Sequence, residues 1–142
     1  MNRPSRIALS LLAGVALIWL VQFAAAAVSA IPGLASLLRW LHANQFPSEI
    51  LSPGIVAWLP VFGMSLIVGL VTFRLPERRF ILFSCTAAPF FAYSLYMNVG
   101  MWVSAGSSFE TAVLQPQAWL IVLVALLGLG TALLACPRHG AA

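Results

Sequence analysis

The chain has 142 residues, of which 62% are hydrophobic and only 7% are charged, and its mean hydropathy is +1.02. A soluble domain carries about 25% charged residues, because its surface must stay hydrated. The composition therefore excludes a soluble globular domain, and it also excludes intrinsic disorder, a disulfide-rich secreted module and a collagen-like fibre. We expect an integral membrane protein.

The formal net charge is +4, which in a soluble protein would suggest a nucleic-acid partner. All seven cations are Arg, and they lie in the short segments between apolar runs instead of forming one basic stripe or patch. We therefore expect the lipid bilayer, and no nucleic acid, as the surroundings of this chain. The exclusive use of Arg, with abundant Ala, Leu and Gly, is typical of a GC-rich bacterial genome.

Four apolar stretches are long enough to cross a bilayer, for which an α-helix needs about 20 residues. We expect spans at residues 7–31, 50–73, 80–104 and 118–136. The predicted fold is all-α, an antiparallel bundle of four transmembrane helices in a single multi-pass domain over residues 1–142. Ser52-Pro53 and Pro116 are expected to begin the second and fourth helices, since Pro is favoured in the first turn.

The first span has an alternative interpretation. Arg3 and Arg6, then an apolar run, then small residues up to Ala30 resemble a signal peptide with a cleavage site after Ala30. We favour an uncleaved helix, because the run from Ile7 to Val21 already has the maximum length of a signal-peptide core and continues beyond it. Cleavage would leave three spans.

The segment after the first span predicts a short external amphipathic helix near residues 33–43. Leucines recur there at helical spacing, at Leu34, Leu37, Leu38 and Leu41. Trp40 is expected to anchor this helix at the membrane interface as a connector on the outer surface. The alternative is a lid or a surface that docks a partner, in which Arg39 and Trp40 would make the contact.

The other connections are shorter. Residues 75–79 are so few that the second and third spans are expected to be antiparallel neighbours. Residues 106–117 are polar and are expected to be a solvated connection.

The distribution of Arg predicts the orientation. Six of the seven cations fall on one side of the predicted topology, and only Arg39 falls on the other; the six are Arg3, Arg6, Arg74, Arg78, Arg79 and Arg138. Because cytoplasmic loops carry the excess of positive charge, the N-terminus, the middle loop and the C-terminus are expected in the cytoplasm. The expected location is the inner membrane of a bacterium.

Groups that could carry chemistry are few. No Glu or Arg falls inside a predicted span, so proton-coupled transport through a buried carboxylate is disfavoured. His42 and His139 are expected on opposite sides of the membrane and cannot share a metal ion. Cys85 and Cys136 are interpreted as small hydrophobic residues. We expect no catalytic, cofactor-binding or metal-binding residues.

The third span is the most polar. By a rise of about 1.5 Å per residue, Gln22 in the first span and Tyr93 and Tyr96 in the third lie at similar depth, with Asn98 above them. One interpretation is that these groups form hydrogen bonds between helices that hold the bundle together. The other is a small polar intramembrane cavity that binds a side chain of a partner or a lipid head group.

Small residues spaced by four allow helices to approach closely. Such pairs occur in three spans, as Ser10 with Gly14, Ser65 with Gly69 and Gly128 with Ala132. They fit either packing within the bundle or contact with another protein, so Gly128 and Ala132 join Arg39 and Trp40 as a possible interface. Bends are expected at Pro60 and Pro89.

Three classes of function fit these features. The favoured one is a small non-enzymatic protein that binds a partner membrane protein, or a second copy of itself, by helix packing and external-loop contact, as an accessory subunit, an assembly factor or an immunity-type protein does. A small oligomeric transporter or channel is the first alternative. The second is a membrane enzyme that modifies a lipid or a quinone.

Overall fold

A computed structural model describes residues 2–44, 54–75 and 77–136. These residues are all-helical, with no strand among them. The elements in chain order are α1 (Arg3–Ser29), α2 (Leu34–Ala43), a π-helical turn η1 (Gly54–Trp58), α4 (Leu59–Thr72), α5 (Arg79–Ser104), α6 (Phe109–Val113) and α7 (Pro116–Ala135).

Three helical segments are long and apolar enough to cross a membrane: Arg3–Ser29, Gly54–Thr72 and Arg79–Ser104. They agree closely with the first three stretches expected from the sequence. The fourth stretch is also a helix, α7, whose apolar part over Trp119–Ala135 is shorter. α7 begins at Pro116, as predicted, whereas the predicted start at Ser52-Pro53 lies outside the described residues.

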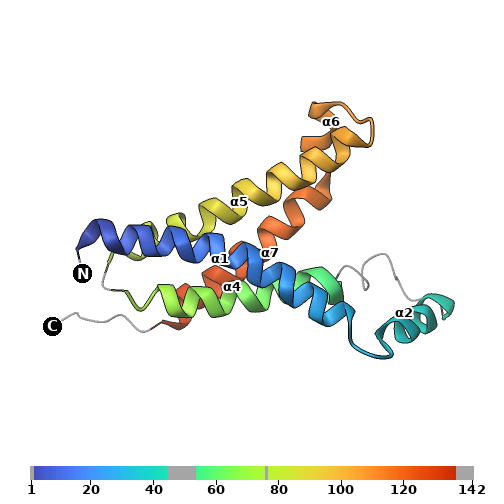
Figure 1. The fold of residues 1–142 in the computed structure, drawn as a ribbon, viewed down its shortest axis with the longest axis horizontal. Helices are drawn as coiled ribbons and strands as arrows, with labels where there is room; N and C mark the ends of the chain where they lie inside the picture. The colour runs from blue at the N-terminus through green and yellow to red at the C-terminus, as the bar shows by residue number, and fades with distance from the viewer. Residues whose placement is uncertain (1, 45–53, 76, 137–142) are drawn as a thin grey trace.

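The four long helices alternate in direction along the chain (Figure 1). α1 begins and α7 ends at one end of the molecule, which we call the arginine-rich end. Toward the opposite end, the pair α1 and α4 diverges from the pair α5 and α7, so that the molecule divides into two arms (Figure 1). We call this the open end.

The expected contact between the second and third spans is wrong in one respect. α4 and α5 do run antiparallel, but they touch each other far less than either touches α1 or α7. The most extensive contacts join α4 to α7 and α1 to α5, which places α4 and α5 diagonally across the bundle. The short connection between them crosses the end of the bundle and does not force side-by-side packing.

Close approach through small residues explains both of these extensive contacts. A Cβ added to Gly128 of α7 would lie 2.7 Å from the backbone oxygen of Phe62 and 2.8 Å from Cβ of Ser65, both in α4. A Cβ added to Gly69 would lie 2.6 Å from Cβ of Ala132. The Ser65–Gly69 pair of α4 and the Gly128–Ala132 pair of α7 therefore interlock with each other.

The contact between α1 and α5 involves Gly14, from the third pair of small residues, Ser10 with Gly14. Gly14 of α1 faces α5 so closely that an added Cβ would collide with the backbone oxygen of Thr86 and lie 3.0 Å from the ring of Pro89. Pro89 lies inside α5, where it cannot donate a backbone hydrogen bond. Pro60 stands in the first turn of α4, which follows the π-helical turn η1, so of the two predicted prolines Pro60 lies beside irregular backbone.

The arginine-rich end is held together by polar contacts. Arg79, at the start of α5, donates hydrogen bonds to the backbone oxygens of Leu133 at 3.3 Å and Cys136 at 2.9 Å. These oxygens belong to the C-terminal end of α7, where the last backbone carbonyls have no hydrogen-bond donor within the helix. The partial negative charge of this helix end also attracts the guanidinium group. Glu77, in the α4–α5 connection, pairs with Arg3 at 3.7 Å and with Arg6 at 4.0 Å, both in α1.

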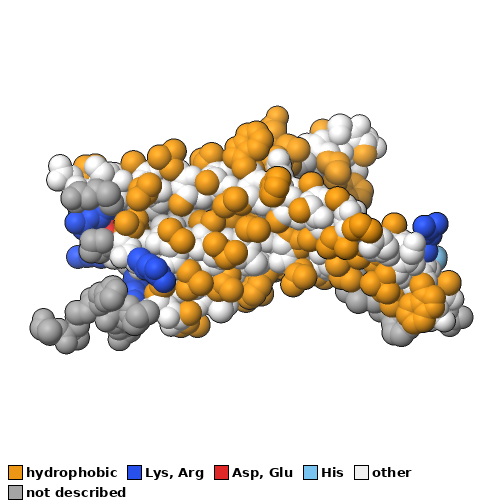
Figure 2. Space-filling model, turned by 60° about the horizontal axis from the view of Figure 1, so that its bottom comes forward, with side chains coloured by type: hydrophobic (Ala, Val, Ile, Leu, Met, Phe, Trp, Pro, Cys, Tyr) orange, Lys and Arg blue, Asp and Glu red, His pale blue; other side chains and the backbone are white. Residues whose placement is uncertain are grey.

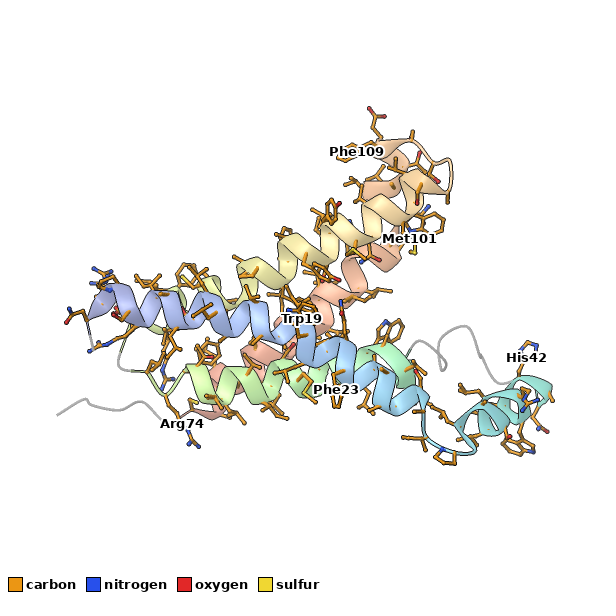
Figure 3. All side chains as sticks on the ribbon, in the orientation of Figure 1. Trp19, Phe23, His42, Arg74, Met101 and Phe109 are labelled. Atoms are coloured by element: carbon orange, nitrogen blue, oxygen red, sulfur yellow. The ribbon has the colours of Figure 1, made fainter. Side chains whose placement is uncertain are left out.

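Between the two ends, hydrophobic side chains are spread over the face that Figure 2 shows, and the charged side chains lie at the ends. The sides of α1 that face outward carry Trp19 and Phe23, which are 71% and 75% exposed (Figure 3). Such residues would face water in a soluble protein. In this molecule they belong to the many large hydrophobic residues exposed on the long helices between the ends.

The connections at the open end hold two short helices. α2 matches the amphipathic helix predicted near residues 33–43, and it extends beyond the four long helices (Figure 1). Residues 106–117, expected to be only a solvated connection, contain the short helix α6. Ser108 caps this helix, because its hydroxyl oxygen accepts a hydrogen bond from the backbone N–H of Thr111 at 3.3 Å. Trp119 of α7 donates a hydrogen bond from its ring to the backbone oxygen of Val113 at 2.7 Å, which fixes α6 to α7.

Candidate functional site

A cleft of about 200 Å³ lies where the two arms separate. It lies between α1, η1 and the start of α4 on one arm and α5 and α7 on the other. Most of its lining is apolar, including Ile18, Val61, Phe90 and Ile121. Four polar side chains join this lining: Gln22, Tyr93, Ser94 and Asn98.

A hydrogen bond joins the two arms inside the cleft. Nε2 of Gln22 on α1 donates to the hydroxyl oxygen of Tyr93 on α5, at a distance of 2.5 Å. These are two of the residues that the sequence places at similar depth. Because the Tyr93 oxygen accepts this bond, its own proton remains available to donate to another group.

Asn98 lies one turn beyond Ser94 on the same side of α5. Its Nδ2 donates to the backbone oxygen of Ser94 at 2.8 Å, which uses one of the two amide protons. The second proton and the side-chain oxygen have no partner among the described residues. The polar part of the cleft therefore combines neutral donors and acceptors, and the described residues that line it include no Arg, His, Asp or Glu.

Tyr96 is not brought to this cleft. It lies on the outer side of α5, where it is 75% exposed and lines a different hollow. Side chains three residues apart on an α-helix differ by about 60° around its axis, and this difference places Tyr93 at the cleft and Tyr96 on the outer side. Of the four residues predicted to cluster, Gln22, Tyr93 and Asn98 share the cleft.

Two further hollows lie outside this cleft, one between α5 and α7 and one between α5 and α6. The α5/α7 groove, of about 610 Å³, includes Phe80, Leu127 and Gly130. The α5/α6 groove, of about 580 Å³, includes Tyr96, Gly100 and Phe109. Each groove contains a glycine at which an added Cβ would meet nothing within 4 Å.

The residues proposed as an interface fall in two different places. Gly128 and Ala132 are buried in the contact between α4 and α7, so they cannot belong to a surface that meets another protein. This corrects that part of the prediction, and the reason is that the facing pair on α4 already fills the available space. Arg39 and Trp40 lie on α2, where both side chains are exposed.

The remaining reactive side chains are dispersed. His42 lies on α2 at the open end, as Figure 3 shows, while Cys85 and Cys136 are free thiols in α5 and after α7. Cys136 is buried among Phe73, Leu82 and Leu129. Within the part of the chain that the structure describes, no three His, Cys, Asp or Glu side chains come together. His139 lies outside the described residues.

Several cleft and groove residues were not singled out from the sequence. Phe90 precedes Asn98 by eight residues on the helix, and Ile18 and Ala25 lie one turn before and after Gln22. This helical spacing around the predicted polar residues is the signal that could have identified them. For Gly100 and Gly130 no such signal exists, because small residues are frequent throughout these helices.

The comparisons with known proteins give no match. No family model matches the chain, and no curated protein or solved structure is significantly similar to it.

Proposed function

We propose that this chain is a four-span protein of the inner membrane of a bacterium. Three of its helices have the length and hydropathy for this role, and the outer surface between the two ends is apolar. α7 packs along α4 and α5, so a bilayer that contains those two helices also contains α7. With 20 residues, α7 is about 30 Å long, which equals the hydrocarbon thickness of a typical bilayer.

In this arrangement the arginine-rich end faces the cytoplasm. Among the described residues, five Arg lie at this end, and only Arg39 lies at the other; the five are Arg3, Arg6, Arg74, Arg78 and Arg79. Figure 2 shows the same separation of blue side chains at the two ends. The proposal follows from the excess of Arg that cytoplasmic segments carry.

The protein acts, in this proposal, without a catalytic step, by binding the transmembrane helix of a partner membrane protein. The observation that carries the proposal is the glycine in each outer groove. A glycine inside a helix costs about 1 kcal/mol relative to alanine, and neither Gly100 nor Gly130 gives space to a neighbour within this chain. A partner helix that packs into the groove would use that space, as small residues do at contacts between membrane helices.

The external helix α2 offers the second contact. Its exposed Trp40 and Arg39 lie beyond the open end of the bundle, on the side proposed to be periplasmic. An aromatic ring and a guanidinium group are enriched at protein interfaces. We expect α2 to touch the external part of the same partner.

Photo-crosslinking in cells tests this proposal. Three exposed phenylalanines would each be replaced by a photoreactive benzoyl derivative: Phe80 in the α5/α7 groove, Phe109 in the α5/α6 groove, and Phe23 on α1, which lines neither groove. We expect one discrete protein adduct from Phe80 or Phe109, and only lipid adducts from Phe23. The control position is as exposed as the test positions but lines neither groove; Figure 3 labels Phe23 and Phe109.

A second step connects the adduct to the glycines. Gly130→Leu should abolish a Phe80 adduct and Gly100→Leu a Phe109 adduct, because the larger side chain fills the groove. Gly63→Leu is the matched control, since an added Cβ there also meets nothing within 4 Å but the residue lines neither groove. Lipid adducts alone at all three phenylalanines, or a protein adduct that survives the groove substitutions, would contradict the proposal.

A further inference from the structure

The cleft between the arms has the chemistry of a ligand site, and it is separate from the grooves assigned to a partner helix. None of its lining residues is Gly100 or Gly130. Its position depends on the proposed membrane placement. Counted from Arg79 at about 1.5 Å per residue, Tyr93 lies about 21 Å and Asn98 about 29 Å along α5, within the half of a 30 Å hydrocarbon layer that faces the periplasm.

Two of the polar groups of the cleft can donate a further hydrogen bond. The Tyr93 hydroxyl receives the Gln22 amide proton and therefore directs its own proton elsewhere. Asn98 retains one amide proton after its bond to Ser94. Tyr93 and Asn98 both line the cleft, so each can donate a hydrogen bond to an acceptor on a ligand inside it.

The charge of the cleft limits the ligand to an uncharged one. The described lining contains no cation that would attract a phosphate and no acid that would attract an amine. All the described Arg residues lie at the arginine-rich end or on α2, and none lines the cleft. In a site surrounded by lipid, a charged head group would remain without a counter-charge, at a large desolvation cost.

The size of the cleft indicates that it holds only a part of the ligand. A volume of about 200 Å³ is smaller than the 300–1,000 Å³ or so that encloses a complete small molecule. The remaining lining is apolar, with Ile18, Val61 and Met97 among its members. A polar head group would fit inside, while an attached hydrocarbon chain would follow the apolar walls into the bilayer.

We propose that the cleft binds the uncharged head of a membrane amphiphile, whose carbonyl groups accept hydrogen bonds from the Tyr93 hydroxyl and the Asn98 amide. Two kinds of membrane molecule carry such a carbonyl on a hydrocarbon chain: a quinone and the ester of a neutral acylglycerol. The cleft recognises the chemistry that they share, and the binding experiment distinguishes between them.

Titration calorimetry of the purified full-length protein in a nonionic detergent measures this binding. The probes are a benzoquinone with a decyl chain, dioctanoylglycerol, and the anionic dioctanoylphosphatidylglycerol as the charge control. We expect one of the two uncharged probes to bind, and the one that binds identifies the source of the carbonyl. The anionic probe should bind more weakly.

Paired tyrosine variants locate the site. Tyr93→Phe removes one hydroxyl donor and should weaken binding about three- to tenfold, the range for a lost neutral hydrogen bond. Tyr96→Phe is the matched control, because the same change three residues away lies on the outer face of α5, and it should leave the affinity unchanged. Ala25→Leu, which fills the cleft without removing a hydrogen bond, should also weaken binding.

Three outcomes would overturn the proposal: no binding of either uncharged probe, tighter binding of the anionic lipid, or equal weakening by Tyr93→Phe and Tyr96→Phe. The Ala25→Leu variant keeps the test decisive if Tyr93→Phe does not fold. Failure here leaves the crosslinking results at Phe80 and Phe109 unaffected, since those residues do not line the cleft.

Discussion

Buried hydroxyl groups in the bundle differ in their contribution to stability, because some have a hydrogen-bond partner within the described part of the chain and others have none there. Thr72 and Thr86 are both buried, with 4% and 0% of their surface exposed. The Thr72 hydroxyl donates to the backbone oxygen of Val68 at 2.8 Å, whereas the Thr86 hydroxyl has no partner among the described residues. A buried hydroxyl without a partner costs about 1–3 kcal/mol, so Thr86 is a source of instability next to the close contact with Gly14.

The two threonines therefore predict opposite effects of the same substitution. Thr86→Val keeps the shape and removes an unpaired polar group, so we expect the free energy of unfolding to rise by about 1 kcal/mol. Thr72→Val removes a satisfied hydroxyl and should lower it by about 0.5–1.5 kcal/mol. Unfolding by sodium dodecyl sulfate, followed by circular dichroism in mixed micelles, measures both. Equal losses of stability in the two variants would show that the Thr86 hydroxyl has a partner.

Polar residues inside apolar helices could be identified from the sequence, but the face on which each one lies could not. Gln22, Tyr93 and Asn98 stand out because they interrupt apolar runs, and a count of helical rise gives their depth. Tyr96 stands out in the same way, yet it lies on the outer face. Rotation about the helix axis is not readable here, because apolar side chains cover both the packed and the outward faces of these helices.

At the scale of whole elements, the packing depends on which glycine faces which helix. Gly128 and Gly130 are two residues apart on α7 and therefore lie on different sides of it. The first meets backbone and Cβ atoms of α4 at less than 3 Å from an added Cβ, and the second meets nothing within 4 Å. The contact between α4 and α7 therefore tolerates no side chain at Gly128.

Alanine at these two positions should have effects of opposite sign. Gly128→Ala forces α4 and α7 apart and should destabilise the protein by about 1–3 kcal/mol. Gly130→Ala should be neutral or stabilising by up to about 1 kcal/mol, since alanine is the better helix former. The same micelle unfolding measurement compares them. If Gly130→Ala proves as harmful as Gly128→Ala, the arrangement of α7 described above is incorrect.

Element boundaries were largely predictable, whereas element neighbours were not. The length of apolar runs, the proline at Pro116 and the leucine spacing in α2 located the helices to within a few residues. The short α4–α5 connection suggested direct packing of those helices, but the small residues of α4 face α7 instead. Loop length limits only the distance between helix ends, so it does not determine which faces meet.

At the scale of the whole molecule, the two ends differ in how they are held. At the arginine-rich end, Arg79 links α5 to α7 and Glu77 links the α4–α5 connection to α1. Toward the open end the arms separate, and the bond between Gln22 and Tyr93 crosses between them. The sequence predicted the charge asymmetry of the two ends, but not these contacts, which join residues more than fifty positions apart.

The central claim is that four helices cross the membrane with the arginine-rich end in the cytoplasm. Labelling of single cysteines in intact cells by a membrane-impermeant maleimide tests it, after Cys85 and Cys136 have been replaced by Ala. We expect Ser36→Cys in α2 and Glu110→Cys in α6 to be labelled in intact cells, and Ser5→Cys and Arg78→Cys only after the cells are permeabilised. Labelling of Ser5→Cys from outside, or of Ser36→Cys and Glu110→Cys from opposite sides of the membrane, would contradict the account.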